Sequence, residues 1–111
     1  MNFKEIGESI GLEEDEYIEM IEIFVESGGE DLQKLETAIK EADVEKAHEA
    51  SHSIKGSSGS LMLDAVYEIA KSMDDILRIG KFDNVEEMLN KLKNEYETIK
   101  MAFLEKEKNN S

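Results

Sequence analysis

No proline occurs anywhere in the 111 residues of this chain. Proline lacks a backbone hydrogen-bond donor and breaks a helix when it lies in the interior. No helix in this sequence is therefore interrupted by a proline. Glutamate, lysine, leucine, isoleucine, alanine and methionine are abundant, and most of these residues favour the helix intrinsically. The sequence therefore predicts an all-α fold.

The length and the charge limit what such a fold can be. A chain of 111 residues is the size of one ordinary domain with one hydrophobic core, so we expect a single domain over residues 1–111. It carries 13 lysines and arginines against 27 aspartates and glutamates, a formal net charge of −14. This charge repels a polyanionic backbone, and nucleic acid is therefore not expected as a partner.

Two further absences exclude other classes of protein. The sequence has no cysteine, which excludes a disulfide framework, a thiolate metal site and a thiol nucleophile. The N-terminal residues show no basic region followed by an apolar run, and no segment approaches 18 consecutive apolar residues. We expect a protein of the cytoplasm with no contact to a membrane.

Apolar residues recur at helical spacing in successive blocks. A short helical piece within residues 1–11 is expected to cap one end of the fold. The next block covers residues 13–27, and Gly28 and Gly29 are expected to end it. A further apolar stripe follows within residues 32–42. The methionines mostly fall at core spacing, and we expect them to fill gaps in the core and not to form a binding surface.

The second half of the chain predicts three more helical features. Asp43 is a good N-cap for a helix whose buried seam contains several small residues. That seam consists of Val44, Ala47, Ser51, Ile54, Ser58 and Leu61. A helix then begins near Asp64 and stops at Gly80, and a longer one begins near Asp83 and ends in a polar, fraying tail over residues 105–111. Short connections make neighbouring helices antiparallel, which predicts an up-and-down four-helix bundle with a short N-terminal capping helix.

The segment AHEASHSIKGSSGSL, residues 47–61, contains the only two histidines. On a helix, His48 and His52 lie one turn apart on one face, which Lys55 and Gly56 continue and Gly59 extends by one more turn. Glycine inside a helix costs about 1 kcal/mol relative to alanine. Both glycines lie away from the apolar seam, so we interpret them as giving another protein access to His52.

An exposed imidazole is substantially neutral at physiological pH and is then nucleophilic. Lys55 lies one turn from His52 and could pair with a phosphoryl group held there. Two simpler interpretations stand beside this one. His52 could be an ordinary solvated side chain, and the glycines could only let two helices pack closely.

Metal binding is a further alternative. His-x-x-x-His is ligand spacing on one helix, and Glu45-Lys-Ala-His48 is a Glu-x-x-His element of the kind found in di-iron bundles. A di-iron site needs a second such element from another helix, and the sequence has no third histidine. A di-iron centre is therefore nearly excluded, whereas a weak zinc site stays open. A hydrolytic triad is not expected, because no other histidine can serve as its base and the sequence has no cysteine.

The segment HSIKGSSGSL resembles the phosphoacceptor motif of histidine-containing phosphotransfer (HPt) domains. That motif is a histidine, an aliphatic residue two positions later, Lys-Gly, and then small residues that end in leucine. The matching positions are His52, Ile54, Lys55, Gly56, Ser57, Ser58 and Leu61. The flanking segments EADVEKAHEASH and RIGKFD are also similar to the family, and the resemblance spans about residues 12–103.

The resemblance implies a phosphorelay intermediate of two-component signalling, with His52 as phosphoacceptor, Lys55 as phosphoryl-stabilising cation and Gly56 as clearance residue. In such an intermediate, His52 would accept a phosphoryl group from a receiver-domain aspartate or a sensor histidine kinase and donate it to a receiver domain. The resemblance also implies that the protein is not an enzyme and has no cofactor of its own, because the receiver domain supplies the carboxylates and Mg²⁺. We expect a monomer, because the long helices are committed to one core.

Five further positions bear on this interpretation. Asp74 stands where family members often place Gln or Glu to hold the other imidazole nitrogen. Ser57 and Gly59 are expected to support the site, and His48 is expected to be a flanking surface residue. Met62 departs from the family, which usually has glycine at that helix junction. The alternatives to phosphotransfer are a helical interaction module without chemistry and a weak zinc-binding bundle.

Overall fold

The computed structural model describes residues 1–109, and this part of the chain contains helices and no strand. Five helices follow one another: α1 (Phe3–Ser9), α2 (Glu14–Lys40), α3 (Val44–Ser60), α4 (Asp64–Arg78) and α5 (Val85–Asn109). The predicted all-α class is confirmed.

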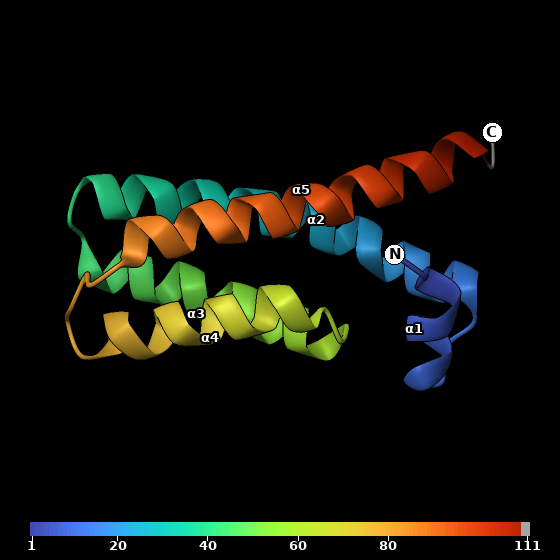
Figure 1. Cartoon of the computed structure of the whole chain (residues 1–111), viewed down its shortest axis with the longest axis horizontal. Coiled ribbons are helices and arrows are strands. Elements are labelled where there is room, and N and C mark those ends of the chain that lie inside the picture. The colour runs from blue at the N-terminus through green and yellow to red at the C-terminus, as the bar shows by residue number, and fades with distance from the viewer. Residues whose placement is uncertain (110–111) are drawn as a thin grey trace.

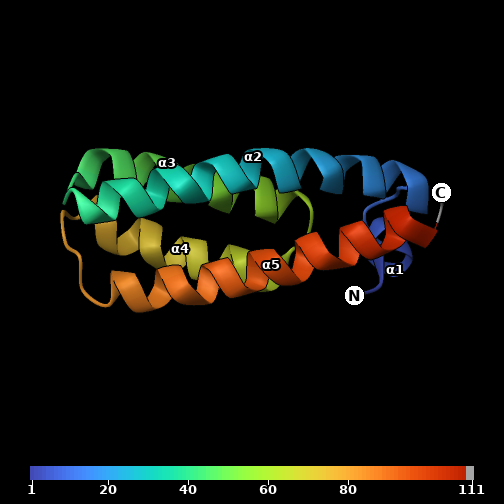
Figure 2. The same cartoon turned by 90° about the horizontal axis from the view of Figure 1, so that it is seen from above.

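Helices α2 to α5 form an elongated antiparallel bundle, and α1 lies at one end of it (Figure 1). Helix α3 packs against both α2 and α4, and α5 closes the bundle against α2 and α4. Seen from above, α2 and α5 run past the ends of α3 and α4 toward α1 (Figure 2). Phe3 of α1 is buried against Tyr17 of α2, with 6.0 Å between the ring centroids. The predicted four-helix bundle with a short capping helix is confirmed.

The predicted break at Gly28 and Gly29 was wrong, because α2 runs through both as one helix of 27 residues. The reason lies on α5. A Cβ atom at Gly29 would be 2.7 Å from the Tyr96 hydroxyl oxygen, and one at Gly28 would be 3.5 Å from the Tyr96 ring. The Tyr96 hydroxyl donates a hydrogen bond to the Val25 carbonyl at 2.5 Å. The two glycines therefore make room for a side chain of another helix.

The junction between α2 and α3 is a short turn. Helix α2 ends at Lys40, and Ala42, predicted to continue the apolar stripe, is exposed with a φ of 54°. The Asp43 side chain accepts a hydrogen bond from the Lys46 amide at 3.1 Å. Asp43 is thus the N-cap of α3, as predicted.

The predicted seam of α3 is also confirmed in its main part. Ala47, Ser51, Ile54, Ser58 and Leu61 are buried, and Val44 is half-buried. Small residues on the seam let α3 lie close to its neighbours, and each buried hydroxyl bonds within its own helix. The Ser58 hydroxyl, for example, donates to the Ile54 carbonyl at 2.6 Å.

Met62 lies between α3 and α4 with a φ of 57°, in the left-handed region that favours glycine. Its side chain is exposed, while its neighbours Leu61 and Leu63 are buried. The Tyr17 hydroxyl donates to the Leu61 carbonyl at 2.6 Å and so ties this junction to α2. The two leucines and the tyrosine hold a turn that is unfavourable for Met62 itself.

At the C-terminus, the prediction of a fraying tail over 105–111 was wrong for residues 105–109, because α5 continues through Asn109. Lys106 of this last part forms an ion pair with Glu14 at 2.9 Å. Residues 110 and 111 lie outside the described part of the chain. Within residues 1–109, no helix combines the length and the apolar character needed to cross a bilayer.

Candidate functional site

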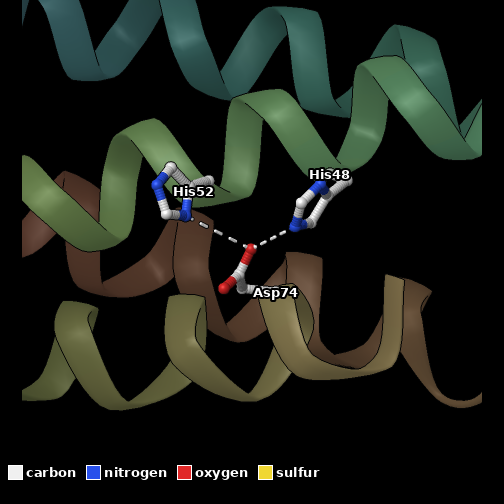
Figure 3. Close-up of side chains that lie close together, drawn as sticks. All are labelled: His48, His52 and Asp74. Atoms are coloured by element: carbon white, nitrogen blue, oxygen red, sulfur yellow. Dashed lines mark ion pairs between the residues drawn. The ribbon is translucent and has the colours of Figure 1, made fainter. Parts of the chain in front are cut away.

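His48, His52, Lys55 and Gly56 form one face of α3, which we call the acceptor face. Figure 3 shows two of these side chains converging on Asp74 of α4. Asp74 Oδ1 lies 2.8 Å from His48 Nε2 and 3.6 Å from His52 Nδ1, and Asp74 Oδ2 lies 3.3 Å from Lys55 Nζ. A carboxylate on one helix thus meets three nitrogen groups from a neighbouring helix.

Asp74 is the buried charge of this site, with only 1% of its surface exposed. It sits beside Met73 on the buried side of α4, one helical turn from Ala70 and from Leu77. A buried carboxylate is costly unless cations or hydrogen-bond donors surround it. The acceptor face supplies those groups, so the burial of Asp74 depends on α3.

The His52 side chain is 67% exposed. Its Nδ1 is turned toward Asp74, and the other ring nitrogen points away from it (Figure 3). The separation of 3.6 Å between these two atoms is too long for a direct N–H···O hydrogen bond, but it is short enough for an ion pair. The family resemblance implied that Asp74 faces His52, and in the structure Asp74 Oδ1 lies 3.6 Å from His52 Nδ1.

His48 was predicted to be a flanking surface residue, and its position corrects that prediction. Its side chain is 33% exposed, and its Nε2 is closer to Asp74 than the His52 nitrogen is. The helical spacing indicated that the two histidines share a face. It could not show that both lie against the same carboxylate, because that depends on how α4 packs.

Lys55 is half-buried, and its ammonium group bonds Asp74 Oδ2 at 3.3 Å. The sequence suggested a phosphoryl group as its partner, and the structure shows a carboxylate partner. The ammonium group still lies on the acceptor face beside His52.

The two glycines differ in their surroundings. A Cβ atom at Gly56 would meet no packed neighbour within 4 Å in the described chain, so the space beside His52 is open. A Cβ atom at Gly59 would lie 3.1 Å from the Tyr67 ring of α4. The interpretation of Gly59 as an access residue was therefore wrong, because this glycine lets α3 and α4 approach. Ser57 is half-buried and donates to the Ile54 carbonyl at 3.3 Å.

Sequence reasoning did not name the residues of an apolar surface next to the acceptor face. Met20 and Ile23 of α2 are 39% and 64% exposed. They line a shallow pocket together with Phe24, Ser27, Ser57, Ser60 and Leu61. The prediction that the methionines mostly fill gaps in the core was wrong for Met1, Met20, Met62 and Met101, which are exposed. Ile23 lies outside the apolar stripe of its helix, and an apolar residue in that position could have indicated an exposed apolar surface.

Comparisons with known proteins identify the family of the chain. The family model described as Hpt domain matches residues 19–102, which include the whole acceptor face and Asp74. No curated protein matches the sequence. The fold is similar to the crystal structure of histidine-containing phosphotransfer protein B (HptB) from Pseudomonas aeruginosa PAO1. That likeness has a TM-score of 0.78 and 22% sequence identity, over 86% of this chain and 84% of that chain. Because the family model covers most of the chain and includes its exposed histidine, the chain belongs to the Hpt domain family.

Proposed function

We propose that His52 accepts a phosphoryl group from a receiver-domain aspartate or a sensor kinase and donates it to a receiver domain. Membership of the Hpt domain family supports a histidine phosphotransfer role in a phosphorelay, with receiver domains and kinases as the class of partner. The similar protein of Pseudomonas aeruginosa is named for histidine-containing phosphotransfer.

One observation carries the assignment to His52. Its imidazole is 67% exposed, with one nitrogen toward a buried carboxylate and open space at Gly56 beside it. When Nδ1 carries the proton that faces Asp74, the lone pair of neutral imidazole is on Nε2, which points outward. Asp74 thus favours the tautomer whose outer nitrogen can attack phosphorus.

The transfer step then balances without an added proton. The bond between phosphorus and the aspartate oxygen of the receiver breaks, the bond between phosphorus and His52 Nε2 forms, and the aspartate leaves as a carboxylate. The phosphorylated ring keeps its proton on Nδ1 and is positive, next to Asp74 at 3.6 Å. Return of the phosphoryl group to a receiver reverses these bond changes.

The remaining groups of the acceptor face support this step. Lys55 now contacts Asp74. It would shift part of this contact to the phosphoryl oxygens, with which its ammonium group can form charge-assisted hydrogen bonds. The receiver would supply its own carboxylates and Mg²⁺, so the chain needs no cofactor and acts as an intermediate. Met20 and Ile23 would extend the docking surface onto α2. The chain would act as a monomer, because one core uses the apolar faces of all four long helices.

Incubation with a phosphorylated receiver domain tests the assignment. The wild-type chain should gain acid-labile, alkali-stable phosphate, and His52→Gln should gain none. The thermal transition of this variant should change little, because exposed substitutions usually alter stability by less than about 0.5 kcal/mol. Glu49→Gln, an exposed change on the same helix, is the matched control and should accept phosphate normally.

Lys55→Ala in the same assay should accept phosphate more slowly. Phosphate acceptance by His52→Gln would show that His52 is not the acceptor. Absence of phosphate on the wild-type chain with every receiver tested would favour an interaction module without chemistry.

A further inference from the structure

The acceptor face and Asp74 bring together three side chains that are common ligands of transition metals. His48 and His52 come from successive turns of α3, and Asp74 comes from α4 (Figure 3). One donor atom from each residue lies within 4.8 Å of the other two. Imidazole nitrogen and carboxylate oxygen are both ordinary zinc ligands.

Asp74 supplies a second, independent observation. Its Oδ1 is buried and accepts no hydrogen bond from the described residues, although two imidazole nitrogens lie 2.8 and 3.6 Å away. A buried oxygen without a hydrogen bond is destabilising, and it is more so when it is charged. A cation between Oδ1 and the two rings would satisfy it.

The distances suit a tetrahedral ion. Zinc bonds to nitrogen and oxygen at about 2.0–2.2 Å, which places neighbouring ligand atoms roughly 3.3 Å apart. The distances from Oδ1 to the two imidazole nitrogens, 2.8 and 3.6 Å, are one shorter and one longer than this value. The donor atoms of the two rings lie within 4.8 Å of each other, and both rings are partly exposed, so they can move toward a common ion.

Lys55 would orient the carboxylate within the site. Its ammonium group bonds Oδ2 at 3.3 Å and leaves Oδ1 as the free donor atom. Outer contacts of this kind fix the orientation of a metal ligand. Asp74 would therefore bind through one oxygen, and the fourth position of the ion would remain open to water.

We propose that His48 Nε2, His52 Nδ1 and Asp74 Oδ1 form a binding site for Zn²⁺ or a similar transition-metal cation, and that the bound cation prevents phosphorylation of His52. The second part rests on the proposed function. Neutral imidazole has one nitrogen lone pair free for bonding. When Nδ1 gives this pair to the metal, the proton lies on Nε2, and Nε2 can no longer attack phosphorus. The contact with Asp74 and the contact with zinc thus select opposite tautomers of the same ring.

Binding is tested first, by calorimetric titration of the full chain with Zn²⁺ alone. One ion should bind per chain, and His48→Gln, His52→Gln and Asp74→Asn should each weaken binding at least about tenfold. Asp75→Asn is the matched control for Asp74→Asn, because Asp75 is exposed and pairs with Arg78, and it should leave binding unchanged. Since Asp74 is buried, thermal unfolding checks the fold of its variant. The two histidine variants, at an exposed and a half-buried position, test the site even if the Asp74 variant unfolds.

Nitrogen-detected spectra of the imidazole rings identify the bonded atoms. Zinc should shift His48 Nε2 and His52 Nδ1, and His52 Nε2 should then carry the proton. Wild-type binding no tighter than that of the three variants, or a shift confined to other residues, would overturn the site.

Phosphorylation is tested with phosphoramidate, a small donor that needs no receiver domain and no receiver-bound metal. Saturating zinc should reduce phosphate on wild-type His52 at least about tenfold relative to the zinc-free protein, because the bound tautomer lacks the Nε2 lone pair. Unchanged phosphorylation with zinc bound would overturn the inhibition. Absence of phosphohistidine in the zinc-free protein would instead contradict the proposed function and leave the binding result intact.

Discussion

At the scale of single residues, Asp74 joins the side chains of the site. It is buried on α4, and three nitrogen-bearing side chains of α3 lie within 3.6 Å of its oxygens. The exposed histidine therefore has one nitrogen directed toward the buried carboxylate and the other available to a partner. The clearance at Gly56 then allows a partner to reach that outer nitrogen.

Gly56→Leu should block phosphoryl transfer without unfolding the bundle. A leucine side chain would fill the open space beside His52, while its helix propensity exceeds that of glycine by up to roughly 1 kcal/mol. Thermal unfolding should show equal or higher stability, and transfer from a phosphorylated receiver should become slower.

The matched control is Gly59→Leu, at a glycine that contacts the Tyr67 ring. It should lower stability, because its side chain meets α4. Normal transfer by Gly56→Leu together with a lower melting temperature would show that Gly56 serves packing.

At the scale of elements, α2 stays one continuous helix through its contacts with neighbouring helices. It crosses two adjacent glycines without a break, because Tyr96 of α5 occupies the space that their side chains would need. The same helix is anchored at its other end by the bond from Tyr17 to the Leu61 carbonyl.

Gly29→Ala should destabilise the protein by on the order of 1 kcal/mol, although alanine is the better helix former. The added Cβ would lie 2.7 Å from the Tyr96 hydroxyl, which is held by its bond to Val25. In a Tyr96→Phe background that contact is absent, and the same substitution should become neutral or stabilising. Urea unfolding of the four proteins in a double-mutant cycle measures the coupling. Equal effects of Gly29→Ala in both backgrounds would contradict the role assigned to Tyr96.

Tyr17 should make stability depend on alkaline pH. Burial, and then the nearby Asp64 carboxylate, raise the pKa of Tyr17 from 10.0 to about 12. The unfolded chain therefore loses this proton first, so the contribution of Tyr17 is complete below pH 10 and is lost as the pH rises toward 12.

The measurement is the free energy of unfolding in urea at pH 8 and pH 11. The decrease between these two values should be smaller for Tyr17→Phe than for wild type. At pH 8 the variant should be less stable by about 1 kcal/mol, because it lacks the bond to Leu61. An equal decrease in both proteins would show that Tyr17 does not cause the loss of stability between pH 8 and pH 11.

For the whole molecule, the net charge of −14 limits how a partner can be recognised. The overall field does not attract an acidic receiver, and the Lys55 ammonium is already paired with Asp74. Recognition should therefore rest on short-range contacts at the acceptor face and at the adjoining apolar surface of Met20 and Ile23.

Receiver binding should consequently not weaken as the salt concentration rises. Screening of the repulsion between two acidic proteins should leave the affinity equal or make it tighter. Titration of an acidic receiver domain at low and at physiological ionic strength checks this expectation. A steep loss of affinity with salt would indicate attraction between oppositely charged surfaces.

The features that the sequence determined by itself are those set within one helix. Asp43 caps α3 because its side chain reaches an amide three residues later. The buried seam of α3 follows from helical periodicity. The shared face of His48 and His52 follows from their spacing of four residues. These relations involve neighbours along the chain, so the pattern of residue types is sufficient to predict them.

The tertiary structure alone decided the features that join two helices. Gly28 and Gly29 looked like a helix end, and only the position of Tyr96 shows that they are a site of close packing. Similarly, only the packing of α4 turns His48 toward Asp74. A glycine has the same low helix propensity wherever it occurs, and a histidine can face solvent or a carboxylate. Which of these applies is set by the side chain opposite, which can be tens of residues away in sequence.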